Sequence, residues 1–326
     1  MRLLSSAQSR RHRMPQQSSA NAIGIIGLGA MGAGIAGAMR ACGLNVIGCD
    51  VSEQARRAFT AEGGRCVAHP HELAAECRIV VMVVVNAEQV ETVLFGDDGL
   101  AARLASRSLI VQCATVAPSY ARDLGERLAN HDLMMLDAPI SGGAVKAKSG
   151  HLSVMASGCE AAFTMGSEAL DAMAAQVYRL GDSPGVGSSV KLVNQHLAGV
   201  HIAAAAEAMA LGIRMGIDPH TLYDVITHSA GNSWMFENRV PHILAGDYTP
   251  LSAVDIFVKD LNLVHQTGRE LTFAMPVAAS ALQQFTAASG AGLGKEDDAA
   301  VIKVYQRLSG LDLPAANDTD HSEVTS

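Results

Sequence analysis

The glycine-rich segment Gly27-Leu28-Gly29-Ala30-Met31-Gly32 constrains the fold of this chain more than any other feature of its sequence. It follows a short apolar run, Ile23 to Ile26, and opens a stretch of helical character. Glycines at this spacing allow a tight turn, let the backbone approach a pyrophosphate, and let the helix pack closely on the strand. The free N–H groups at the start of the helix attract phosphate oxygens. The context therefore predicts a dinucleotide-binding unit rather than a turn without a ligand.

An acidic residue stands where such a unit would meet the adenosine ribose. Asp50 ends the second apolar run, Leu44 to Cys49. A carboxylate at this place accepts hydrogen bonds from the ribose hydroxyls and repels a 2′-phosphate. Arg56 and Arg57 follow only one turn or more into the next helix, so they weaken the preference slightly. The expected cofactor is NAD rather than NADP.

The pattern of apolar runs changes halfway along the chain. Short apolar strands alternate with helical stretches in the first half, which predicts a mainly parallel sheet with helices on both faces. The expected strands lie at residues 22–27, 44–49, 66–68, 79–85, 109–113, 133–136, 152–156 and 177–180. Only helical patterns follow, at residues 186–216, 219–228, 252–271, 276–288 and 295–308. The predicted fold class is α/β: a Rossmann-type doubly wound parallel sheet, then an all-α helical domain joined to it by a long interdomain helix.

A cluster of Gly and Pro between residues 181 and 187 marks the expected domain boundary. We expect a dinucleotide-binding Rossmann domain at residues 22–184 and an all-helical substrate and oligomerisation domain at residues 185–310. Residues 1–21 and 311–326 are polar and are expected to be a disordered extension and a disordered tail. The arginine-rich composition of residues 1–20 also fits a transit peptide or an upstream start codon, and the sequence leaves this choice open.

Composition excludes several classes of partner. Of the 326 residues, 49% are hydrophobic and 17% are charged, against about 25% charged in ordinary globular chains. This surplus predicts a large core and a subunit interface, hence a homodimer or homotetramer. A net charge of −8 and 4% aromatic residues disfavour a nucleic-acid partner. The longest strictly apolar run, residues 79–85, is far below the roughly 20 residues of a membrane span.

The cysteines and histidines predict no metal site. The six cysteines form no CxxC pair, which is typical of free thiols in a reducing compartment and favours a cytoplasmic location. His69-Pro70-His71-Glu72 looks like a metal cluster, but Pro70 breaks the helix that such a site would need. We therefore expect a small-molecule substrate and no metal.

Three further motifs place polar residues where chemistry is expected. Asp137-Ala138-Pro139-Ile140-Ser141-Gly142-Gly143 follows a strand, and its N–H groups suit a carboxylate unless the segment is only a turn. Lys191, Asn194 and Gln195 share one face of the long helix. A buried lysine there would have a lowered pKa and serve as general acid/base, whereas a surface lysine would not. Phe257-Val258-Lys259-Asp260-Leu261 carries a lysine–aspartate pair that is either functional or solvated.

The four motifs together, in this order, resemble those of the β-hydroxyacid dehydrogenase family, which includes 3-hydroxyisobutyrate, tartronate semialdehyde and 6-phosphogluconate dehydrogenases. The resemblance covers residues 22–308 and implies an NAD-dependent oxidoreductase acting on CH–OH groups. Residues 231–241 and 255–261 look most like the branch that oxidises the C2 hydroxyl of a four-carbon sugar acid, L-threonate, to 2-oxo-tetronate. This branch reading also fits Gln195, because the family usually has the shorter Asn at that position.

The resemblance implies a role for each residue that matches the family pattern. Lys191 matches the catalytic general acid/base. The implied substrate-binding residues are Ser141, Gly142, Gly143, Asn194 and Gln195. The implied cofactor-binding residues are Gly27, Leu28, Gly29, Ala30, Met31, Gly32, Asp50, Val84, Val85, Thr115 and Lys259.

Two alternatives remain beside the sugar-acid dehydrogenase. One is another member of the family, such as a tartronate semialdehyde reductase or a 3-hydroxyisobutyrate dehydrogenase. The other is a dinucleotide-binding interaction protein without catalysis. Asp50 argues against an NADP-linked reductase, and the presence of Lys191 argues against a chain that has lost its activity.

Overall fold

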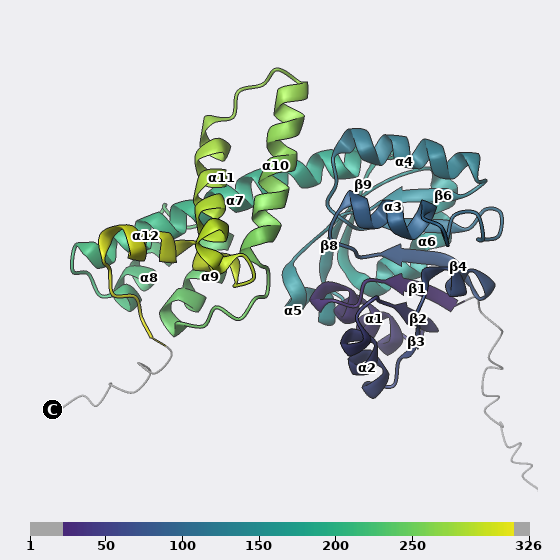
Figure 1. The fold of residues 1–326 in the computed structure, drawn as a ribbon, viewed down its shortest axis with the longest axis horizontal. Coiled ribbons are helices and arrows are strands. Elements are labelled where there is room, and N and C mark those ends of the chain that lie inside the picture. Colours follow the sequence, from purple (N-terminus) through teal and green to yellow (C-terminus); the bar gives the residue numbers. More distant parts are fainter. Residues whose placement is uncertain (1–21, 316–326) are drawn as a thin grey trace, which may run out of the picture.

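The structure is a computed structural model of the chain, and it describes residues 22–315. The extension expected at residues 1–21 and most of the expected tail lie outside this range. A strand-rich body and a helical body lie side by side, with one long helix running from the first into the second (Figure 1).

The strand-rich body is built on one nine-stranded sheet, in the order β3-β2-β1-β4-β5-β6-β8-β7, with β9 beside β8. Its strands are β1 (Ala22–Ile26), β2 (Val46–Cys49), β3 (Arg65–Val67), β4 (Cys77–Met82), β5 (Leu109–Gln112), β6 (Met134–Asp137), β7 (Ile140–Ser141), β8 (Leu152–Ser157) and β9 (Ala174–Gly181). The first six strands pair in parallel, which confirms the predicted fold class. However, β8 runs antiparallel to both β6 and β7. The two residues of β7 are too few to show a period-2 pattern, so the sequence did not predict this strand.

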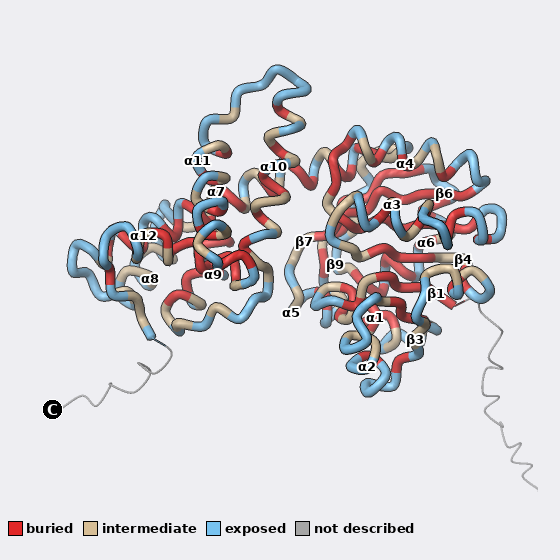
Figure 2. Tube along the Cα trace, viewed as in Figure 1, coloured by how far each residue is buried: buried red, intermediate tan, exposed pale blue. Residues whose placement is uncertain are grey.

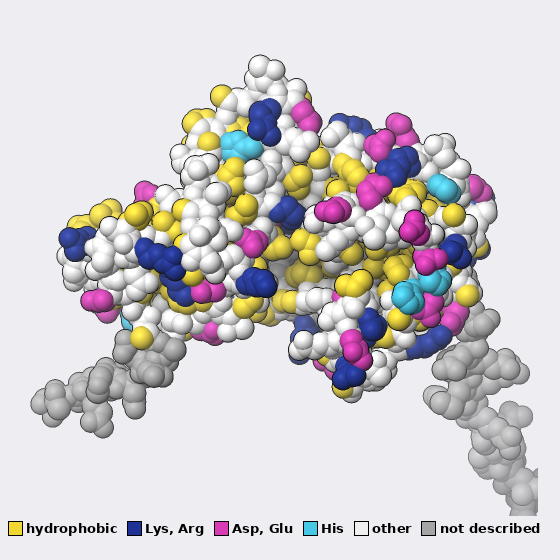
Figure 3. Space-filling model, in the orientation of Figure 1, with side chains coloured by type: hydrophobic (Ala, Val, Ile, Leu, Met, Phe, Trp, Pro, Cys, Tyr) yellow, Lys and Arg dark blue, Asp and Glu magenta, His cyan; other side chains and the backbone are white. Residues whose placement is uncertain are grey.

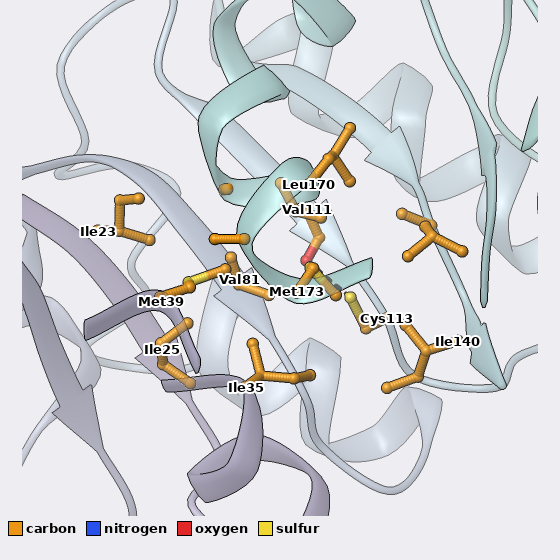
Figure 4. Close-up of a cluster of buried hydrophobic side chains, with 14 of the residues drawn as sticks. Ile23, Ile25, Ile35, Met39, Val81, Val111, Cys113, Ile140, Leu170 and Met173 are labelled. Atoms are coloured by element: carbon orange, nitrogen blue, oxygen red, sulfur yellow. Dashed lines mark hydrogen bonds between the residues drawn. The ribbon is translucent and has the colours of Figure 1, made fainter. Parts of the chain in front are cut away.

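Helices cover both faces of the sheet. They are α1 (Ala30–Ala41), α2 (Glu53–Ala61), η1 (Pro70–Ala75), α3 (Ala87–Phe95), α4 (Pro118–Asn130), α5 (Gly143–Lys148) and α6 (Glu160–Met173). One core lies between the sheet and α1 and α6, and a second lies between the sheet and α3 and α4. Neighbouring residues of β5 alternate between these cores: Leu109 and Val111 join the first, Ile110 the second. Figure 4 shows the first core, and Figure 2 shows the buried strands between the two helical layers.

The helical body is organised around α7 (Val186–Arg214), which starts five residues after β9 ends. The other elements are α8 (Pro219–Thr227), α9 (Trp234–Ala245), α10 (Val254–Glu270), α11 (Pro276–Ala288), η2 (Ser289–Leu293), η3 (Asp298–Val301) and α12 (Ile302–Ser309). Leu311 is buried in the core that these helices share, so the described helical body continues past residue 310. Among the described residues, α7 alone is long and apolar enough to span a membrane. Half of that window is buried inside the protein, so this is weak evidence for a span.

Helix α9 was not among the expected helices because Pro241 lies inside it. A proline has no N–H to donate to the carbonyl four residues earlier, and it usually interrupts a helix. That carbonyl belongs to Glu237, and the hydroxyl of Tyr223 in α8 donates to it at 3.2 Å. A tertiary contact therefore replaces the missing helical hydrogen bond.

Candidate active site

The glycine loop between β1 and α1 is shaped to receive a phosphate chain. Gly27 has a φ of +92°, and a Cβ on Gly32 would lie 1.8 Å from the carbonyl oxygen of Gly27, so neither position tolerates a side chain. A Cβ on Gly29 would meet no protein atom within 4 Å, which leaves this face of the loop open. Leu28 is buried, whereas Ala30 and Met31 begin α1 at the more exposed mouth of the loop. The loop fits a dinucleotide pyrophosphate at the N-terminus of α1.

Asp50 lies directly after β2 and faces the glycine loop. Its carboxylate accepts hydrogen bonds from the N–H of Leu28 at 2.6 Å and the N–H of Ser52 at 2.7 Å. Arg56 is occupied with the backbone, because it donates to the carbonyl oxygens of Asp50 and Val51. Arg57 pairs with Glu53. The carboxylate is thus held beside the loop, where a ribose hydroxyl would meet its free lone pairs.

Three more residues of the predicted cofactor site follow the neighbouring strands. Val84 and Val85 were expected inside the fourth strand, but β4 ends at Met82, so they lie in the loop beyond it. The N–H of Val85 donates to Gln89, which bends this loop back onto α3. Thr115 lies just beyond β5 and is half-buried. Because β1 and β4 are adjacent while their helices leave in opposite directions, these loops border the crevice at the switch point of the sheet.

The segment Ser141–Gly143 joins β7 to the short helix α5. Gly142 caps α5 with a φ of +132°, and a Cβ there would lie 2.9 Å from the side chain of Lys146. A Cβ on Gly143 would meet nothing within 4 Å, so the backbone at this helix start is open. The open N–H groups can bind an anion such as a carboxylate.

Lys191 lies in the second turn of α7 and is only 7% exposed. The pKa of its ammonium group is lowered to about 8, mainly by burial; the charge of Asp260 opposes this shift, and the charge of Lys259 adds to it. The alternative of a surface lysine is therefore wrong. An amine that is neutral near pH 8 can accept and return a proton.

The Lys259–Asp260 pair is not solvated, because Asp260 is only 1% exposed. The ammonium group of Lys259 lies 2.6 Å from the Asp260 carboxylate and also donates to the carbonyl oxygen of Thr115 at 3.2 Å. The second contact joins the helical body to the edge of the cofactor crevice. Asp260 also accepts a hydrogen bond from the side-chain amide of Gln195 at 2.5 Å.

Gln195 is already engaged on both sides of its amide. Its nitrogen donates to Asp260, and its oxygen accepts a hydrogen bond from the amide of Asn194 at 3.0 Å. Asp260 was not among the predicted site residues, although it stands next to Lys259 in the sequence. The side-chain length of Gln195 was the available signal, since the extra methylene lets the amide reach Asp260 on α10.

Trp234, the first residue of α9, lies near the strand-rich body. Its side chain is half exposed, and the ammonium group of Lys146 on α5 lies 5.9 Å from its ring centroid, so α5 and α9 approach one another across the two bodies. Ser233 is occupied as the cap of α9 and accepts a hydrogen bond from the N–H of Phe236. Hydrophobic side chains gather around the recess between the bodies in Figure 3. No cluster of His, Cys, Asp and Glu that could hold a metal lies within residues 22–315.

Two models of known protein families match the chain. Residues 22–181 match the family described as the NAD binding domain of 6-phosphogluconate dehydrogenase. Residues 185–305 match the family described as the NAD-binding domain of NADP-dependent 3-hydroxyisobutyrate dehydrogenase.

Individual relatives match over almost their whole length. The L-threonate dehydrogenase of Cupriavidus necator is 56% identical, over 90% of this chain and 97% of that protein. The L-threonate dehydrogenase of Escherichia coli K12 is 50% identical, with the same coverage. A Salmonella typhimurium crystal structure described as 3-hydroxyisobutyrate dehydrogenase is 53% identical, with a TM-score of 0.82 over 86% of this chain and 99% of that one. This chain therefore belongs to the 3-hydroxyisobutyrate dehydrogenase family and is a nicotinamide-dependent oxidoreductase.

Proposed function

We propose that this enzyme oxidises the C2 hydroxyl of L-threonate to 2-oxo-tetronate with NAD, and that Lys191 is its general acid/base. The observation that carries the proposal is the buried Lys191, whose pKa is lowered to about 8 beside Asp260 and Lys259. The choice of L-threonate as substrate is supported by the two L-threonate dehydrogenases that are 50% and 56% identical to this chain.

Lys191 takes the proton from the hydroxyl during oxidation. Its neutral form is required, and the low pKa makes that form accessible near pH 8. The lone pair of the amine accepts the hydroxyl proton as the C2–H bond breaks and the C2=O bond forms. When bound, the nicotinamide ring supplies the acceptor for the hydride that leaves C2.

The remaining site residues position the substrate. The open N–H groups at Ser141–Gly143 hold its carboxylate. Asn194 presents its free carbonyl oxygen to the substrate, while its amide nitrogen is bound to Gln195. In this proposal Gln195 supports Asn194 and Asp260 rather than touching the substrate through a free amide. Trp234 and Lys146 border the recess where the distal hydroxyls would lie.

The preference for NAD rests on Asp50. Its carboxylate is held beside the glycine loop by two N–H donors, so a 2′-phosphate would meet a fixed negative charge. Both nearby arginines are occupied by other partners, Arg56 by the backbone and Arg57 by Glu53, so neither is placed to offset this repulsion.

We further propose that the protein forms a homodimer or homotetramer in the cytoplasm. One face of α7 exposes the large apolar side chains of Val193, Leu197 and Leu211, and Met215 directly after the helix is also exposed. Contiguous exposed apolar surface is typical of a subunit interface. All six cysteines are free thiols, as expected in a reducing compartment.

The test is NADH formation with a panel of acids: L-threonate, D-threonate, D-erythronate, D-glycerate and 3-hydroxyisobutyrate, each with NAD and with NADP. Turnover of L-threonate with NAD is the expected result. Preferential turnover of 3-hydroxyisobutyrate, the substrate named for the Salmonella structure, would retain the mechanism and overturn the substrate. Light scattering on the same preparation tests the oligomer, and a clean monomer would contradict it.

A further inference from the structure

A second buried carboxylate, Asp137, lies outside the reaction described above. It is the last residue of β6 and is fully buried. One of its oxygens accepts hydrogen bonds from the N–H of Gly185 and the N–H of Ser188, both at 2.8 Å. The other accepts from the hydroxyl of Ser188 at 2.7 Å. These donors belong to the first turn of α7 and to the residue before it, so a residue of the sheet caps the long helix from a distance of about fifty positions in sequence.

The contact between α7 and the sheet is unusually close. The N–H of Gly187 donates to the hydroxyl of Ser157 on β8 at 3.0 Å. A Cβ on Gly187 would lie 2.3 Å from the carbonyl oxygen of Met155 and 2.6 Å from that of Asp137. The first turn of α7 therefore rests on the ends of β6 and β8. The carboxylate also lies at the positive end of a 29-residue helix, where a negative charge is favourable.

Asp137 connects two parts of the proposed active site. In one direction it leads, four residues later, into Ser141 and the carboxylate-binding segment. In the other it binds Ser188, which lies one turn before Lys191 on the same face of α7. Ser188 is 1% exposed, so this link is shielded from solvent. The positions of the proton acceptor and of the substrate anion site are thus fixed by one carboxylate.

We propose that Asp137 is a positioning residue that fixes Lys191 relative to the Ser141–Gly143 segment by holding the first turn of α7 on the sheet. This inference rests on the proposed function for the reaction that it serves. Asp260 has a different role, because its negative charge raises the pKa of Lys191. Asp137 instead determines the position of the helical turn that carries Lys191.

The side-chain chemistry separates geometry from charge. In Asp137→Asn, the amide oxygen can still accept from the N–H groups of Gly185 and Ser188, and the amide nitrogen can donate to the hydroxyl of Ser188. The hydrogen-bond geometry survives without the charge. Asp137→Ala loses all these bonds. We therefore expect Asp137→Asn to retain most of the turnover, and Asp137→Ala to lose about 100-fold in kcat, the loss associated with a misplacement of about 1 Å.

The matched control is Asp298→Ala. Asp298 is also fully buried, and it binds Arg239 within the helical body, away from Lys191. Both alanine variants are expected to lower the melting temperature, because each removes a buried hydrogen-bonded carboxylate. Only Asp137→Ala should lower kcat, measured well below the melting temperature. NAD affinity and the pH midpoint of kcat should stay unchanged in both, because neither carboxylate borders the glycine loop or contributes to the Lys191 pKa.

Several outcomes would overturn the proposal. One is an Asp137→Ala enzyme with a kcat close to wild type, and another is equal loss of kcat in the two alanine variants. If Asp137→Ala does not fold, Ser188→Ala removes only the hydroxyl contact; a smaller fall in kcat supports the proposal, and an unchanged kcat contradicts it. A wild-type enzyme that ignores L-threonate but oxidises another acid would instead refute the proposed substrate, and the variants would then be compared on that acid.

Discussion

The two sides of the cleft are built in different ways. On the nucleotide side, the loop from Gly27 to Gly32 presents backbone atoms, and a pyrophosphate can approach it only because the glycines have no side chains. On the helical side, Asp260 contacts both Gln195 and Lys259, and the charges of Asp260 and Lys259 act on the buried Lys191. Cofactor binding should therefore be sensitive to an added Cβ in the glycine loop, and proton transfer to the loss of a charge around Lys191.

This difference predicts that mutations on the two sides change different measured properties of the enzyme. Added atoms in the glycine loop should reduce cofactor binding and leave the pH dependence unchanged, because no titrating group lies in the loop. Changed charges around Lys191 should shift the pH dependence and leave cofactor binding nearly unchanged. Each variant therefore has an internal control: the pH dependence should not change in variants of the glycine loop, and NAD affinity should not change in variants around Lys191.

The largest expected effect comes from Lys191→Ala. Removing the general base should lower kcat by about 100- to 10,000-fold, while the dissociation constant for NAD, measured by fluorescence titration, stays close to wild type. Lys295→Ala, at an exposed position of the helical body and outside the predicted site residues, is the matched control and should retain full activity. A Lys191→Ala enzyme with near-wild-type rate would remove the acid/base assignment.

Gly29→Ala should produce the opposite symptom. Its methyl group meets no protein atom within 4 Å, so the fold and melting temperature should be kept. The methyl group would stand where the pyrophosphate approaches, and losing a charge-assisted hydrogen bond of about 1.5–3 kcal/mol would weaken NAD binding by about 10- to 100-fold. Gly37→Ala, equally free of contacts and about two turns further along α1, is the control. If both variants bind NAD equally well, the pyrophosphate does not lie on this loop.

Asp260→Asn should shift the pH dependence of oxidation. The negative charge of Asp260 raises the Lys191 pKa, so its removal lowers that pKa, and the neutral amine then predominates at lower pH. We expect the pH midpoint of kcat/KM to fall by about one unit. Lys259→Met removes a positive charge and should move the midpoint upward. Shifts of the same sign in both variants would contradict the charge arrangement.

Asp50→Ser has the smallest expected effect. Removing one charge at about 4 Å in a solvated site relieves roughly 1 kcal/mol of repulsion, so kcat/KM for NADP relative to NAD should rise by about fivefold. Asp97→Asn, at an exposed position outside the cofactor site, serves as the charge control. An unchanged ratio would show that discrimination against the 2′-phosphate does not depend on this carboxylate.

The sequence predicted those helices and strands in which apolar residues recur at regular spacing. The parallel strands, the helices between them and the long α7 all carry periodic apolar patterns, and they are present in the structure. The direction of β8 was not predictable, because a strand that is buried on both faces has the same pattern in either direction. Helix α9 was missed because its proline is compensated by a hydroxyl from another helix, and no local rule contains that contact.

The site residues divide in the same way. Glycine spacing pointed to the loop at Gly27–Gly32 because the requirement is local. The contact between Gln195 and Asp260, and that between Asp137 and Ser188, join residues far apart in the chain. Such pairs depend on how the two bodies pack. The sequence therefore placed Lys191 on one face of a helix, while its burial and lowered pKa became visible only in the fold.

Helix α7 has a consequence for how this enzyme can be modified. Lys191 stands in the part of the helix that is clamped to the sheet, while the later turns of the same helix form the core of the helical body. The charge of Lys191, in contrast, is set by Asp260 and Lys259 on α10, so the two halves share control of the proton acceptor. A chimera joined within α7 beyond Gln195 would take the acid/base from one parent and Asp260, the partner of Gln195, from the other. An exchange of substrate preference between relatives therefore has to transfer α7 and α10 together.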